Sequence, residues 1–228
     1  MTLPTHYDVR NGVRRWLGMG NFADGDCVIA AFEHCRMVKA TTGASTWQRV
    51  AYRLGFRPPH SPYALEVYAE YLATQNQKPP NAGVDPNSFF PWAEAKGLIT
   101  GWGTVNVDKT FVDANGLAMR DRLHQAMIDY NGVMMSLELT LNACNYYGSA
   151  QPWHVGPGPN DTPSAGLAHE TLLTTYGPDL DSVVTWGRMK SQTAAFTEAT
   201  TYQAFVFLDH SDTVRPNYSQ LISNIKSL

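Results

Sequence analysis

Cys27 is the first residue whose type and surroundings could carry out chemistry. It lies in the stretch GNFADGDCVIAAFEHC (residues 20–35), where turn-forming residues lead into apolar side chains with helical spacing. Asp26 is a good N-cap, so Cys27 is predicted in the first helical turn, where the helix dipole lowers the pKa of a thiol. The carboxylates of Asp24 and Asp26 act in the opposite direction, because nearby negative charge raises the pKa of a thiol. The alternative is a buried cysteine that only fills the core, and the spacing alone leaves both hypotheses open.

His169 is the candidate base for such a thiol. It opens the apolar segment LAHETLLTTYG (167–177), and an imidazole can take a proton from a thiol and later return it to a leaving amine. The run HETLL begins like the zinc-protease motif HExxH but lacks the second histidine, so we reject that interpretation. The other histidines have no partner at a ligand spacing and no CxxC is present. The sequence therefore predicts neither a metal ion nor a cofactor.

The composition narrows the class of protein. Of the 228 residues 43% are hydrophobic and 16% are charged, which is enough apolar content for a sizeable core. The formal net charge is -3 and no basic stripe stands out, so nucleic acid is not an expected partner. No run reaches the roughly 18 to 20 apolar residues that span a bilayer, and the first residues lack the apolar run of a signal peptide. The three cysteines are expected to be reduced, in a cytoplasmic protein.

Secondary-structure patterns divide the chain into a helical first half and a β-rich second half. Helices are predicted over 27–39, 45–55, 61–75, 85–98 and 115–132. Strands are predicted over 132–139, 167–177, 181–187 and 202–209, and the N-terminal segment could join them. The layout is an α+β fold with a cleft between the two parts.

A long loop, residues 142–166, separates the first two of these strands. It is rich in Gly, Pro and aromatic residues, and such a long loop in a compact domain is usually functional. Tyr146, Tyr147 and Trp153 could line a substrate groove or pack the β-rich part.

The residues before Cys27 resemble the mature N-terminus of papain-like cysteine proteases. That family begins with a proline, has Asp-Trp-Arg four residues on, and places an oxyanion-hole glutamine six residues before its nucleophile. The matching positions here are Pro4, Asp8, Arg10 and Asn21. Asn21 also carries an amide N–H donor, one methylene shorter than glutamine. Gly25 matches the family's glycine two residues before the nucleophile.

The C-terminal half carries the same resemblance. His169 follows Cys27 by 142 residues, inside the roughly 130 to 150 residue window of this family. Gly177 follows His169 by eight residues, as in the family's histidine strand, and Trp186 with Gly187 stands where the family has Trp-Gly.

The resemblance implies the fold and the roles of the residues. It implies a single two-lobed domain over 1–228, with a helical lobe (about 21–129), a β-rich, barrel-like lobe (1–20 plus 130–228) and an active-site cleft between them. It also implies a hydrolase of peptides or amides in which Cys27 attacks, His169 accepts the proton and Asn21 supplies the oxyanion-hole donor. Supporting positions are Trp186, Gly25 and Asp26.

The family pattern breaks at the residue that orients the histidine. An asparagine is usual there, and the alignment on TWG places Val184 at that position, where no hydrogen bond can be accepted. Thr185, Asp181 or Ser182 could substitute if the strand register shifts. A Cys–His dyad can still react without an orienting group.

The chain also resembles uncharacterised papain-like proteins encoded by bacteriophages. This implies an alternative function, a virion structural, decoration or adhesion protein built on a catalytically degenerate papain-like fold. The partners would then be virion structural proteins in place of a peptide or amide substrate. A third option is a peptide-binding module without turnover.

Overall fold

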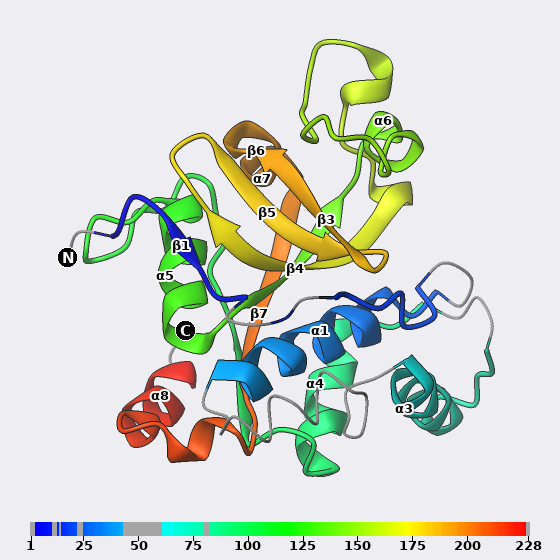
Figure 1. Ribbon diagram of the computed structural model, residues 1–228, viewed down its shortest axis with the longest axis vertical. Helices are drawn as coiled ribbons and strands as arrows, with labels where there is room; N and C mark the ends of the chain where they lie inside the picture. The colour runs from blue at the N-terminus through cyan, green and yellow to red at the C-terminus, as the bar shows by residue number, and fades with distance from the viewer. Residues whose placement is uncertain are drawn as a thin grey trace.

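The computed structural model describes residues 3–10, 13, 15–21, 25–42, 61–79 and 83–226. The helix predicted over 45–55 lies outside the described residues. Helices cover both faces of one antiparallel sheet, so the α+β class predicted from the sequence is confirmed (Figure 1).

Among the described residues the sheet has seven strands, and Trp153 forms an isolated parallel bridge to Gln192 at the β6 edge. Along the sheet the order is β2-β7-β3-β4-β5-β6, every pair is antiparallel, and β1 pairs with β4 off this path. The strands are β1 (Tyr7–Asp8), β2 (Gly101–Thr104), β3 (Val133–Glu138), β4 (Ala168–Tyr176), β5 (Leu180–Thr185), β6 (Arg188–Thr193) and β7 (Thr201–Leu208). The N-terminal segment thus joins the β-rich part, as predicted.

The helices are α1 (Cys27–Thr42), α3 (Ser61–Thr74), α4 (Pro86–Ala95), α5 (Met119–Tyr130), α6 (Leu141–Asn145), α7 (Ala194–Thr200) and α8 (Tyr218–Ile225). Four predicted helices are confirmed with shifted ends. The helix predicted from 115 begins later because the Asp113 carboxylate accepts hydrogen bonds from the backbone N–H groups of Asn115 and Leu117, at 2.8 Å each, which folds these residues into a turn.

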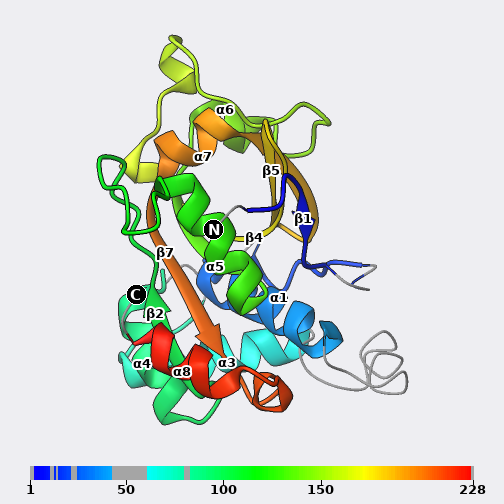
Figure 2. The ribbon, with the colours of Figure 1, turned by 90° about the vertical axis from the view of Figure 1, so that its left-hand side faces the viewer.

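The central strands are buried on both faces. Every residue of β4 except the first is buried, as are the first five of β3, a pattern typical of strands with helices on both sides. Helix α1 packs against β3, β4 and β5, whereas α5 and α7 lie between β7 and β5 in Figure 2. The N-terminus of α1 therefore meets the sheet where β4 begins.

Two sets of contacts hold α1 in place. Near its middle, the Phe32 ring packs against Phe89 and Phe207, at centroid distances of 5.1 and 4.8 Å. Near its end, the buried Lys39 ammonium donates to the Tyr130 carbonyl at 2.6 Å and to the Asp212 carboxylate at 3.0 Å. These contacts tie α1 to the sheet and the C-terminal segment, so its first residue has a fixed position.

Candidate active site

Cys27 is the first residue of α1 and is partly exposed. The chain turns into the helix at Gly25, whose φ of 66° lies in the left-handed region that favours glycine. The Asp26 carbonyl then accepts the hydrogen bond from the Ala30 N–H at 2.9 Å, which is the first bond of the helix. Gly25 and the Asp26 carbonyl thus form the turn that leads into the helix at Cys27.

The electrostatic environment of Cys27 differs from the prediction. Burial raises the pKa of the thiol to about 11, and the carboxylates of Glu170 and Asp26 add to the rise. The backbone N–H groups of Glu170 and Val28 lower the pKa by less. The helix N-terminus was expected to lower this pKa, but burial and two acidic neighbours have the larger effect. At neutral pH Cys27 is a thiol.

His169 lies near the start of β4 and is buried, with 9% of its surface exposed. Its Nε2 atom lies 2.6 Å from the Oγ1 atom of Thr185, the last residue of β5. Burial lowers the pKa of the imidazole to about 3, so His169 is neutral at neutral pH. The structure therefore brings the Thr185 hydroxyl to the imidazole of His169.

Trp186 covers the imidazole of His169. The two rings are stacked, with centroids 4.3 Å apart and an interplanar angle of 18°. Trp186 and Gly187 form the two-residue turn between β5 and β6, with φ values of 44° and 69°. Positive φ at both central residues is typical of the hairpin turn whose twist matches the flanking strands. A non-glycine residue here is strained, so the position of Trp186 is held by its contacts.

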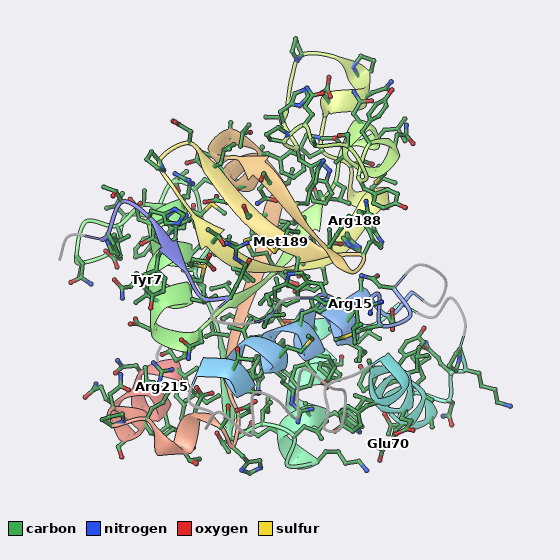
Figure 3. The ribbon with its side chains drawn as sticks, in the orientation of Figure 1. Tyr7, Arg15, Glu70, Arg188, Met189 and Arg215 are labelled. Carbon is green, nitrogen blue, oxygen red and sulfur yellow. The ribbon has the colours of Figure 1, made fainter. Side chains whose placement is uncertain are left out.

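The β5–β6 turn packs closely on the N-terminal segment. A Cβ atom added to Gly187 would lie 2.9 Å from the backbone nitrogen of Gly18, so only glycine fits. Figure 3 labels Arg188, the first residue of β6, and Arg15 of the N-terminal segment. The turn thus connects Trp186 to the segment that leads to Cys27.

Two of the three predicted substitutes for the orienting group, Asp181 and Ser182, have other hydrogen-bond partners. Asp181 is fully buried at the other end of β5, where its carboxylate accepts hydrogen bonds from Arg120 at 2.9 and 3.0 Å. Ser182 lies 3.5 Å from the hydroxyl of Ser191 on β6. Val184 is fully buried opposite Met189. The register that pairs Thr185 with Arg188 places only the last residue of β5 beside His169.

Asn21 is buried, with 9% of its surface exposed, and its backbone N–H donates to the Gly18 carbonyl at 3.0 Å. This turn fixes its backbone between Gly18 and the start of α1. The orientation of its side chain toward an oxyanion stays a prediction.

Glu170 is the site residue that the sequence interpretation missed. It follows His169 on β4 and is 3% exposed. Its backbone N–H donates a hydrogen bond to the Cys27 sulfur. Burial raises the pKa of its carboxyl to about 8. The available signal was a glutamate inside a segment predicted to be a buried strand, because an unpaired buried carboxylate is costly and is rarely placed there without a role.

The aromatic residues of the long loop have different positions. Trp153 is buried and its ring centroid lies 6.1 Å from that of Trp186, while Tyr147 contacts the same indole at 5.2 Å. Tyr146 is 61% exposed and lines a cavity of about 130 Å³ between α6 and residues 149–154. The first two support Trp186, and Tyr146 faces solvent.

Among the described residues, no group of three or more His, Cys, Asp or Glu side chains is placed to hold a metal ion. Within the same residues, no helix combines the length and apolar character that crossing a membrane requires.

No family model and no curated protein matches the chain. Among solved structures, the chain is similar to the cysteine protease CMS1MS2 of Carica candamarcensis, solved in complex with E-64. The identity is 13%, the TM-score is 0.46, and the alignment covers 91% of this chain and 99% of the other. A similarity at this level does not by itself assign a fold family or an activity to the chain.

Proposed function

We propose that the protein is a papain-like cysteine hydrolase, a peptidase or amidase, in which Cys27 is the nucleophile and His169 is the base. The observation that carries the proposal is the position of Cys27 at the start of a helix, with its sulfur beside the backbone N–H of Glu170. Glu170 directly follows His169 on β4. A nucleophile and a base from distant segments are the minimum set for thiol catalysis.

The contacts of His169 support a role as base through its Nδ1 atom. Nε2 is occupied by Thr185 Oγ1 at 2.6 Å, so a base acting through Nδ1 carries its resting proton on Nε2 and donates it to the Thr185 oxygen. The hydroxyl then stabilises the imidazolium that forms during the reaction. Trp186 covers one face of the ring, which excludes water from that side.

The resting pair is uncharged, which sets the order of proton transfer. Cys27 with a pKa of about 11 is a thiol, and His169 with a pKa of about 3 is neutral. The Cys27 proton therefore moves to Nδ1 as the sulfur attacks the acyl carbon, and it then passes to the departing amine. Water hydrolyses the thioester and restores the thiol. Asn21 and the Cys27 backbone N–H are the proposed oxyanion donors.

The proposed architecture is the two-lobed papain-like fold, with the helical lobe over 21–129 and the β-rich lobe formed by 1–20 and 130–228. The proposed substrate is a peptide or amide bound between the lobes. The lobe boundaries and the cleft follow the resemblance in sequence.

A second candidate is a structural protein on a degenerate form of this fold, including a bacteriophage virion protein. The uncharged resting pair and the apolar Val184 favour it, because active thiol enzymes usually lower the pKa of their cysteine.

The test is cleavage of a mixed peptide library, with products identified by mass spectrometry. We expect cleavage by the wild type, loss of cleavage in Cys27→Ala, and unchanged cleavage in Cys144→Ala, which removes another partly exposed cysteine. No cleavage by the folded wild type, or cleavage that persists in Cys27→Ala, would support the structural candidate or a different site.

A further inference from the structure

The Glu170 carboxyl is a buried acid that the proposed mechanism does not use. The Ser136 hydroxyl lies 2.6 Å from its Oε2 atom, across the register pair that joins β3 to β4. Its Oε1 atom is buried and has no hydrogen-bond partner among the described residues. No lysine or arginine of these residues pairs with the carboxyl. Its charge is therefore uncompensated when it ionises.

The groups that surround Glu170 are polar or acidic. From β7, Tyr202 hydrogen-bonds the Ser136 hydroxyl, and burial together with the charges of Glu170, Cys27 and Glu138 raises the pKa of its phenol. Tyr202 is 43% exposed, so this polar chain runs from the buried carboxyl to solvent. Asp26, which directly precedes α1, also acts on Cys27. The carboxylates of Glu170 and Asp26 therefore both make the potential at the thiol negative.

Glu170 acts on Cys27 in two opposite ways. Its backbone N–H stabilises the thiolate, whereas its carboxylate charge opposes the thiolate more strongly than that of Asp26 does. Because both groups lie in a poorly solvated part of the structure, water screens this interaction less than it would at the surface.

We propose that Glu170 is a specificity-determining residue, whose ionised carboxylate creates a negative potential at Cys27 that favours cationic reactants and disfavours anionic ones. The proposal rests on the proposed function, in which Cys27 is the nucleophile. The preferred substrate carries a cationic group near the scissile bond, because that charge offsets the carboxylate and eases formation of the thiolate. The effect acts through space and needs no direct contact.

The selectivity depends on pH in a defined direction. Burial holds the pKa of the Glu170 carboxyl near 8, so the group is mostly neutral at pH 7 and mostly charged at pH 9. The preference for cations therefore grows as the pH rises through 8. The other ionisable groups nearby are Asp26, which precedes α1, Glu138 of β3 and Tyr202 of β7, and burial with its acidic neighbours raises the pKa of the Tyr202 phenol.

The test uses three methanethiosulfonates that differ in charge, with trimethylammonioethyl, methyl or sulfonatoethyl groups. The Cys27 thiolate attacks the sulfenyl sulfur, a disulfide forms and methanesulfinate leaves. Rates at Cys27 are measured by peptide mass spectrometry at pH 7 and pH 9 and are divided by the rates of a small thiol. In the wild type we expect the ratio of cationic to anionic rates to rise about tenfold between the two pH values.

Glu170→Gln keeps the shape and removes the charge, so its ratio should stay constant with pH. Glu138→Gln, which removes a partly buried carboxylate on β3, is the matched control and should keep the rise. If Glu170→Gln does not fold, Ser136→Ala provides a second variant. Loss of this hydrogen bond raises the pKa of Glu170, so the selectivity should appear at a higher pH.

A wild-type ratio that does not change with pH, or a rise that persists in Glu170→Gln, would overturn the role of Glu170 and leave Cys27 as the proposed nucleophile. If none of the three reagents modifies Cys27 in the folded wild type, both this proposal and the proposed function are wrong.

Discussion

Two buried histidines, one on helix α5 and one on strand β4, have different hydrogen-bond partners. His124 of α5 contacts the Asp181 carboxylate at 2.9 Å and stacks on Tyr176 with a centroid distance of 3.8 Å. His169 of β4 lies within hydrogen-bond distance of the Thr185 hydroxyl and stacks on Trp186. By residue type, the His–Asp pair looks more like a catalytic arrangement than the His–Thr pair does.

The groups around the two histidines favour the opposite assignment, with the reactive site at His169. Asp181 also accepts hydrogen bonds from Arg120 and from Thr197, at 2.6 Å for the threonine, so its charge is compensated on every side. This cluster joins α5, α7 and β5, and its members, Arg120, His124, Asp181 and Thr197, include no cysteine. His169 instead directly precedes Glu170, whose backbone N–H faces Cys27. A compensated ion cluster stabilises the fold, whereas an under-compensated site near a nucleophile is suited to react.

Replacement of Asp181 by Asn should have the largest effect and should fall on stability. It leaves the buried charge of Arg120 without its partner, and breaking a buried pair in this way costs about 3–5 kcal/mol. The free energy of unfolding from urea titration checks the prediction. Ser182→Ala, next to it on the same strand, is the control and should change stability by less than about 1 kcal/mol. A stable Asp181→Asn protein with a less reactive Cys27 would place Asp181 in the reactive site.

Thr185→Val should have the second largest effect, and it should fall on reactivity. The change keeps the shape and removes the hydrogen bond to His169, so we expect a loss of about 1 kcal/mol in stability and a drop of about tenfold or more in the hydrolysis rate. Hydrolysis and urea unfolding are measured on the same samples. Thr185→Ser, which restores the hydroxyl, should recover most of the rate. Equal rates in the valine and serine variants would remove Thr185 from the site.

A further prediction concerns the acid dependence of stability due to His169. Its pKa is about 3 when folded and about 6.5 when unfolded, so below pH 6.5 the unfolded state binds the extra proton. The contribution of neutral His169 to stability is present above pH 6.5 and is lost as the pH falls toward 3. His169→Gln should therefore flatten the fall of unfolding free energy between pH 6.5 and 4. His34 has a similarly lowered pKa and leaves a residual slope in both proteins. Identical slopes would mean that His169 is hydrated in the folded state.

The sequence predicted the elements that carry strong periodic patterns. Helix α1 begins at Cys27 as predicted, since Asp26 and the apolar spacing mark its start. The strand β6 (RMKSQT) was missed because its residues are mostly polar, and it forms only as the partner of β5 across the Trp186–Gly187 turn. Strand β2 (GWGT) was missed because two of its four residues are glycines. Tertiary contacts determine both strands.

The candidate site was predicted in part. Cys27 and His169 followed from residue type and spacing, but the choice among Thr185, Asp181 and Ser182 required the strand register. The raised pKa of Cys27 could not be predicted from the sequence. It depends on how deeply α1 packs against β4 and on the charge of Glu170, which lies 143 positions after Cys27 in the chain.

The central claim is that His169, and not His124, is the base that serves Cys27. The direct measurement is the rate of alkylation of Cys27 by iodoacetamide at pH 7, followed by peptide mass spectrometry in the wild type, His169→Ala and His124→Ala. Urea unfolding of each variant establishes that it is folded under the assay conditions. We predict a rate at least about tenfold lower in His169→Ala and a rate close to wild type in folded His124→Ala. Equal rates in the wild type and His169→Ala would contradict the claim.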